Sequence, residues 1–414
     1  MNASPAHPDH PPWLPALAWL LGSLFFFYAW VLRVSPSVIV DELMRDFAVG
    51  GAIVGHLSAL YFYGYAGMQI PVGLLLDRFG PRRLMSSAAV VCAGGCLVFA
   101  LSESLGAASL GRFLMGAGAA FSLVGAMAVA GQWFPARRFA LLGGLAMLLG
   151  MLGGVVGQAP VRLVVEALGW RDTLLGAVAA GLVLAGLLWL TVRDRVRGAG
   201  GIGAMIEGLR VVGANRQTWL VAAAGLGATG PLLAYAGLWG VPYLEVAYGI
   251  ERSAAGAITS LTFLGFGVGA PLVGALSDTL GRRRLPLLAG LATCAVCLAW
   301  LIWVPGVSLA GARLLAFLLG LTSSVQIVCF ALVREHNPVR YSATAIGVVN
   351  AFVTGAGALV QPAMGWVLDL NWDGELVGGA RIYDLGAYRA AFVLLLAGCI
   401  GGFFCALAVR ERAR

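Results

Sequence analysis

The chain has 414 residues, of which 60% are hydrophobic and 11% are charged, so it could not cover a water-soluble domain with polar groups. Its formal charge of +8 comes from arginines spread between apolar segments, which indicates membrane topology and not a nucleic-acid partner. The seven cysteines fall in apolar stretches without a histidine or acidic cluster beside them, so we expect no disulfide, no metal site and no cofactor.

Twelve apolar runs are bounded by charged or turn residues, and a membrane-spanning helix takes roughly 20 apolar residues. Before the first run, Met1 to Pro12 has no basic segment, and no small-residue cleavage site follows, so we expect no cleaved signal peptide. Six helices are predicted in the first half, near 13–39, 51–76, 84–101, 106–132, 139–164 and 173–192. Six more are predicted near 218–240, 253–276, 286–303, 308–333, 342–368 and 388–409.

A polar segment, residues 193–217, separates these two sets of helices. It spaces Ile202, Met205, Ile206 and Leu209 at helical intervals, which predicts a short interfacial helix. The expected fold is an all-α integral membrane protein with twelve transmembrane helices in two pseudo-symmetric six-helix bundles. The first bundle comprises 1–192 and the second comprises 218–414, with a cytoplasmic linker between them.

The two halves repeat each other at an offset of 201 residues. An even number of spans restores the chain's orientation, so this pattern predicts a duplicated unit whose copies rock around a central cavity. The repeat also predicts equivalent positions for two arginines inside the spans. The matching pairs are Gly64 and Gly265, Gly73 and Gly274, Asp77 and Asp278, Gly80 and Gly281, Arg82 and Arg283, Arg83 and Arg284, and Arg112 and Arg313.

The loop arginines orient the protein in the bilayer. When alternate loops are assigned to the two sides, one side receives most of the arginines, among them Arg78, Arg193 and Arg282. The positive-inside rule makes this side cytoplasmic, together with both termini and the linker. Basic residues that are all arginine, with much Ala and Gly, suggest a GC-rich bacterial genome, so we expect a bacterial inner (plasma) membrane.

Two copies of one loop pattern carry a family resemblance. The segments Gly73 to Arg83 and Gly274 to Arg284 resemble the loop signature of the major facilitator superfamily, and Arg112 to Gly118 is similar to the family's fourth-helix motif. The resemblance extends over nearly the whole chain. It implies the twelve-helix fold, alternating access and a cytoplasmic gate formed by charged loop residues, here Asp77, Arg78, Arg82, Asp278 and Arg282.

Helices 1 and 2 look like one branch of that family, the organic anion:cation symporters, which handle sugar acids and other carboxylates. The similarity lies in Arg33 to Val38 and in Tyr65 to Gly73. Members of that branch usually carry Asp before the helix-1 arginine and Glu in the fourth-helix motif. This chain has Leu32 and the pair Ala119 and Ala120 there, so both acids expected to carry protons are missing.

Arginine inside a span costs roughly 2.5 to 3.5 kcal/mol on insertion scales unless it is paired or faces water. Arg33, Arg112 and Arg313 lie inside predicted spans, and a cavity with fixed positive charge attracts an anion, which a guanidinium grips with two hydrogen bonds. The alternative is structural, with Arg33 snorkelling and the other two bonded to backbone carbonyls. We expect further polar groups in the substrate site, namely Tyr61, Tyr235 and Gln326.

Proton coupling lacks its usual acid, because no Asp or Glu falls clearly inside a predicted span. His56 in helix 2 is the candidate proton relay, and Glu335 with His336 is the second candidate. The coupling ion is a proton or sodium. A monomer in the lipid bilayer, with a small-molecule substrate and no nucleic-acid partner, is expected.

The sequence therefore predicts a secondary active transporter of a small organic anion such as a carboxylate. There is no phosphate-binding loop for ATP and no catalytic pair or metal cluster in the spans, so we do not expect an enzyme. Two alternatives stay open. One is an efflux transporter of lipophilic or zwitterionic compounds, and the other is a non-transporting membrane sensor or channel with a carrier fold.

Overall fold

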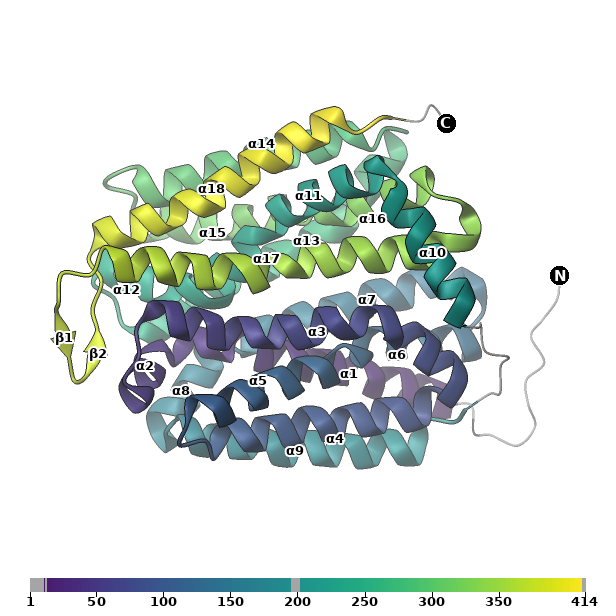
Figure 1. Cartoon of the computed structure of the whole chain (residues 1–414), viewed down its shortest axis with the longest axis horizontal. Coiled ribbons are helices and arrows are strands. Elements are labelled where there is room, and N and C mark those ends of the chain that lie inside the picture. Colours follow the sequence, from purple (N-terminus) through teal and green to yellow (C-terminus); the bar gives the residue numbers. More distant parts are fainter. Residues whose placement is uncertain (1–10, 12, 195–201, 412–414) are drawn as a thin grey trace.

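The computed structural model describes residues 11, 13–194 and 202–411, and these residues form an almost entirely helical molecule (Figure 1). Ten of its helices are long and apolar enough to cross a membrane, and the number rises to twelve if each of two bent helix pairs is one span. The predicted all-α membrane fold is confirmed. The segment Met1 to Pro12, in which no cleaved signal peptide is expected, lies outside the described residues except for Pro11.

The first half of the chain forms one bundle, in which every predicted span is found but several are broken. One break separates α3 from a short preceding helix, and another bends α7 against α8 by 41°. The elements are α1 (Leu14–Val34), the 3-10 turn η1 (Ser35–Val38), α2 (Val40–Phe47), α3 (Gly51–Phe79), α4 (Pro81–Ala100), α5 (Leu105–Ala119), α6 (Phe121–Trp133), α7 (Ala136–Val156), α8 (Ala159–Leu168) and α9 (Trp170–Thr191).

The linker contains the predicted short helix, α10 (Ile202–Ala214). The second half then forms another bundle, which includes a wide π-helical segment and a small antiparallel hairpin that the sequence did not predict. Its elements are α11 (Arg216–Gly230), the π-helix η2 (Pro231–Trp239), α12 (Gly240–Tyr248), α13 (Arg252–Thr279), α14 (Arg284–Trp303), α15 (Leu309–Ser323), α16 (Gln326–His336), η3 (Val339–Tyr341), α17 (Ser342–Leu370), β1 (Leu376–Val377), β2 (Ala380–Arg381) and α18 (Leu385–Ala408).

The two bundles pack on each other through α3 against α17 and α7 against α13. Glycines allow this close approach, since a Cβ on Gly365 would lie 2.1 Å from the carbonyl oxygen of Gly51, and one on Gly154 would lie 2.8 Å from the Phe263 ring. Figure 1 shows α2, α12 and the hairpin at one end of the molecule, which we call the first end. The other end, which holds α10 and the C-terminal end of α18, is the second end.

The packing between the bundles is tight near the first end and looser toward the second. Along α3, contacts with α17 continue from Gly51 to Gln69, whose side-chain oxygen accepts a 2.9 Å hydrogen bond from Asn350. Farther along, Gly73 has open space where a Cβ would lie, and so does Gly274 on α13. Among the described residues, the polar contacts between the bundles lie mainly toward the first end.

Candidate functional site

Arg33 lies at the C-terminal end of α1, inside a cage of aromatic rings. Only 5% of its surface is exposed. Its guanidinium carbon is 4.2 Å from the centroid of Trp30 and 4.6 Å from that of Tyr65, with Tyr61 and Phe62 at 5.2 and 5.7 Å. Cation–π contacts of this kind stabilise a buried cation without neutralising it.

The Arg33 guanidinium keeps free hydrogen-bond donors inside this cage. Its Nε and Nη2 atoms are buried and have no hydrogen-bond partner, and no described carboxylate forms an ion pair with it. The N–H groups of Nε and Nη2 point from one edge of the planar group, an arrangement that matches the two oxygens of a carboxylate. Arg33 is thus a buried, uncompensated cation with one bidentate edge available.

Arg112 on α5 is fully buried, and its contacts are structural. Pro36 has no N–H, so the carbonyl oxygen of Leu32 lacks the donor that an α-helix normally supplies four residues later. Arg112 donates to that oxygen through Nη1 at 2.9 Å, together with the Ser35 hydroxyl at 3.2 Å, and its Nη2 donates to the Ser58 carbonyl oxygen at 3.3 Å. Arg112 therefore joins α5 to α1 and α3 beside Arg33.

Tyr61 on α3 lies between the two buried arginines. Its ring centroid is 5.2 Å from the guanidinium carbon of each, and its hydroxyl donates a 2.9 Å hydrogen bond to the Ala29 carbonyl. The structure thus brings together Arg33, Arg112 and Tyr61, three of the six predicted substrate-site residues.

The two bundles repeat one helix crossing, but with a changed offset. In the first bundle, Gly64 and Gly116 bring α3 and α5 into backbone contact, because a Cβ there would lie 2.2 and 1.8 Å from a carbonyl oxygen of the other helix. Gly265 and Gly320 do the same for α13 and α15, at 2.0 and 1.8 Å. Equivalent residues are therefore 201 apart on α3 and α13, and 204 apart on α5 and α15.

The predicted equivalence of Arg112 and Arg313 is wrong because of this change. The structural counterpart of Arg112 is Ala316, which is also buried, whereas the Arg313 side chain is exposed. Three residues rotate a position on an α-helix by about 300°, which moves Arg313 from the buried face to the outside of α15. The structure does not place Arg313 with Arg33 and Arg112.

The remaining predicted site residues lie elsewhere. Tyr235 is buried in η2, and its ring is 5.8 Å from that of Phe392 on α18, so it packs within the second bundle. Gln326 is buried at the start of α16. The predicted relay His56 is exposed on α3, with its ring 6.0 Å from that of Tyr63.

Of the predicted cytoplasmic gate residues, Arg82 and Asp278 contact residues of their own half of the chain. Arg82 donates from its backbone N–H to Asp194 at 2.7 Å and from Nε to the Trp189 carbonyl at 2.8 Å. Asp278 pairs with Arg283 at 2.7 Å. Arg78 lies over the Phe79 ring, Arg282 is exposed, and the side chain of Asp77 lies outside the described part of the structure.

A polar bridge that sequence reasoning missed crosses the bundle interface at the break between α7 and α8. The Gln158 side chain is buried, and its Oε1 accepts from Ser37 at 3.0 Å and from Thr259 of the second bundle at 3.2 Å. Its Nε2 donates to the Ala236 carbonyl in η2 at 2.6 Å. The sequence feature that could have indicated this bridge is the single amide side chain of Gln158, two residues before Pro160 in an apolar run.

A charged cluster at the first end was also missed. Arg252 at the start of α13 forms ion pairs with Asp41, Glu42 and Glu245, the last two at 3.4 and 2.8 Å. Asp41 and Glu42 belong to α2 of the first bundle, so these pairs join the bundles. Because α2 was not predicted as a separate helix, nothing in the sequence placed these acids beside Arg252.

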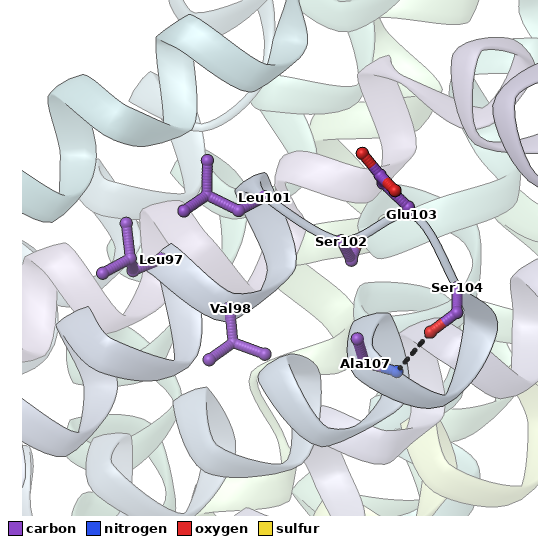
Figure 2. Close-up of a pocket in the computed structure, with 7 residues that line it drawn as sticks. All are labelled: Leu97, Val98, Leu101, Ser102, Glu103, Ser104 and Ala107. Atoms are coloured by element: carbon purple, nitrogen blue, oxygen red, sulfur yellow. Dashed lines mark hydrogen bonds between the residues drawn. The ribbon is translucent and has the colours of Figure 1, made fainter.

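A surface pocket at the turn between α4 and α5 is not part of this site. Figure 2 shows the Ser104 hydroxyl accepting a 3.3 Å hydrogen bond from the Ala107 N–H, which is the helix cap of α5. The pocket is lined by residues of this single turn and lies away from the bundle interface.

Comparison with known proteins identifies the family of this chain and supports its fold. The sequence matches the Major Facilitator Superfamily over residues 19–241 and 232–414. It is 26% identical to the probable sulfoacetate transporter SauU of Cupriavidus necator over 163 residues, which are 39% of this chain and 38% of that protein. It is 28% identical to a quinolone resistance transporter of Acinetobacter baumannii over 191 residues, which are 43% of this chain and 42% of that protein.

The chain spans less than half the length of these curated relatives. Over the whole chain, the structure is similar to the crystal structure of a bacterial homologue of the human lysosomal transporter Spinster, in an inward-facing and unoccupied conformation. The TM-score is 0.78 at 19% identity, covering 98% of this chain and 100% of that one. This likeness shows the fold.

Proposed function

Because this chain belongs to the Major Facilitator Superfamily, we propose that it is a secondary active transporter that carries a small organic anion by alternating access. The anion, such as a carboxylate, binds at Arg33. The two bundles, 1–192 and 218–414, move as units about the linker 193–217, and the protein works as a monomer in the bilayer.

The observation that carries this proposal is the state of Arg33. Its Nε and Nη2 donors are buried without a partner, and because an unpaired charge inside a membrane protein is costly, such a residue indicates a functional site. An anion that reached this edge would satisfy both donors and neutralise the charge. Carboxylate and sulfonate groups both offer two oxygens at a suitable spacing.

Tyr61 and Arg112 support the site in different ways. Arg112 adds positive charge and holds the Leu32 carbonyl, next to Arg33 in the chain. Tyr61 separates the two guanidinium groups and fixes the wall of the cage through its bond to Ala29. Arg313, exposed on α15, is left out of the proposed site, and so is the exposed His56 as a proton relay.

The orientation of the protein follows from its loop arginines. We propose that the second end faces the cytoplasm of a bacterial cell, with both termini there, and that the first end faces the periplasm. The coupling ion is a proton or sodium, and its site is a separate question from the anion site.

A second candidate function is efflux. The relative named as a quinolone resistance transporter favours it, and the relative named as a sulfoacetate transporter favours the anion. The Arg33 cage supports an anionic substrate in either direction of transport.

Counterflow in proteoliposomes tests the function. Purified protein is reconstituted with an unlabelled carboxylate or sulfonate inside, and uptake of the labelled compound is followed, because an alternating-access carrier exchanges the two while a channel or sensor does not. The charge-matched control is Arg210→Gln on the exposed face of α10. Loss of exchange in Arg33→Gln with full exchange in the control supports the proposal, and equal exchange in both contradicts it.

A further inference from the structure

The N-terminus of α3 is capped by a residue of the other bundle. The first N–H groups of a helix have no partner within the helix, and Gly50, at the cap position, has no side chain to offer. The carboxylate of Asp369, in the last turn of α17, accepts from the backbone N–H groups of Gly51 and Ala52, both at 2.9 Å. A negative group at this position also interacts favourably with the dipole of a long helix.

The segment after α17 holds the Asp369 carboxylate in place. The Tyr383 hydroxyl donates to it at 2.5 Å and accepts from the Gly51 N–H at 2.8 Å, while Arg381 of β2 donates to it at 3.1 Å. Burial, followed by the nearby carboxylate, raises the pKa of Tyr383, so its hydroxyl remains a donor. The hairpin beside α2 in Figure 1 therefore carries an anchor for this contact.

The glycines at this contact leave no room for larger residues. A Cβ on Gly50 would lie 2.5 Å from Asp369 Oδ1, and one on Gly51 would lie 3.0 Å from the Tyr383 hydroxyl. Any movement that parts α3 from α17 at the first end must break the hydrogen bonds from Gly51 and Ala52 to Asp369 and the bond from Gly51 to Tyr383, and it returns two helix N–H groups to water.

We propose that Asp369, held by Tyr383 and Arg381, is a latch that keeps the two bundles closed at the first end, and that its release is a step in opening that end. The ion pairs from Arg252 to Asp41 and Glu42 form a second inter-bundle contact at the same end and strengthen the closed state. This inference rests on the proposed alternating-access cycle but not on the identity of the substrate.

The latch is tested by the accessibility of a cysteine placed in the buried interface between the bundles. Ser37 is buried in η1 at the bundle interface, so Ser37→Cys, made with Cys405→Ser, reports opening through its rate of labelling by a membrane-impermeant maleimide. No substrate is added. Failure of this test therefore leaves the Arg33 site untouched, and failure of anion exchange leaves the latch untouched.

Asp369→Asn keeps the size of the side chain and removes its charge. The expected labelling rate is on the order of tenfold faster, the change that corresponds to loss of one hydrogen bond to a charged group. The matched control is Asp384→Asn, because Asp384 caps α18 within its own bundle through the Ala387 N–H at 2.7 Å. That variant is expected to label at the parent rate.

Tyr383→Phe provides the second variant, because it removes only the hydroxyl that contacts Asp369 and Gly51, and it decides the question if Asp369→Asn does not fold. Its labelling is expected to be faster than the parent and slower than Asp369→Asn. Parent-like labelling in folded Asp369→Asn, or in Tyr383→Phe where only that variant folds, overturns the latch. So does equal acceleration by Asp384→Asn.

Discussion

Arg112 donates a 2.9 Å hydrogen bond to the carbonyl oxygen of Leu32, the residue before Arg33. That carbonyl is available because Pro36, four residues later, cannot donate to it. A buried arginine and a proline on different helices are thus parts of one arrangement, which fixes the end of α1 where the proposed anion site lies.

This arrangement predicts that Arg112 and Pro36 are energetically coupled. Arg112→Gln should lower the free energy of unfolding by about 2 to 4 kcal/mol, since it removes two buried hydrogen bonds from a charged group, those to the Leu32 and Ser58 carbonyls. Pro36→Ala supplies an N–H at the place where Leu32 needs one, so Arg112→Gln should cost less in that background. Thermal unfolding of the two single variants and the double variant measures the coupling, and simple additivity would contradict it.

Arg313 should behave differently from Arg112, although the sequence repeat pairs them. Arg313 is exposed on α15, and at the offset of 204 residues its structural equivalent in the first bundle is Ser109, not Arg112. Arg313→Gln should therefore change the melting temperature little and leave anion exchange intact. A loss of exchange as large as that of Arg33→Gln would contradict this prediction and indicate that Arg313 belongs to the anion site.

Gln158 should stabilise the closed first end through its bonds to both bundles. Gln158→Leu leaves the Ala236 carbonyl without its donor and is expected to destabilise the protein by about 1 to 3 kcal/mol. Thr259→Val should cost less, because the Thr259 hydroxyl also contacts the carbonyls of Ala255 and Gly256 within its own helix. The comparison is made by thermal unfolding, and a larger loss for Thr259→Val argues against a bridging role.

Much of the fold could be predicted because apolar runs of membrane length have few alternatives to helix. The breaks within spans were harder to predict. The bend at Gln158 and the π-helix η2 depend on tertiary contacts, such as the bond from Gln158 to Ala236, that no local pattern encodes. The offset of 201 residues between the repeats was derived mainly from loop and α3 residues. It does not hold for α15, because the second half has three additional residues before that helix and the offset there is 204.

The candidate site was predictable where it depends on one helix and not where it depends on packing. Arg33 was identified from its charge inside a span, and Tyr61 and Tyr65, four residues apart on α3, face it as helical spacing allows. Asp369 falls just beyond the predicted helix 342–368, whereas the structure includes it in the last turn of α17. Its role as a cap for α3 joins residues over 300 positions apart, which a single sequence does not reveal.

The central claim is that the buried edge of Arg33 binds the anion, and equilibrium binding tests it most directly. Purified protein is titrated with a labelled carboxylate or sulfonate that the parent exchanges, and Arg33→Gln and Arg33→Lys are compared with Arg210→Gln. Loss of a buried charged pair predicts at least about tenfold weaker binding for Arg33→Gln, with Arg33→Lys between it and the parent because lysine keeps the charge without the bidentate edge. Parent-like affinity in a folded Arg33→Gln protein would contradict the account.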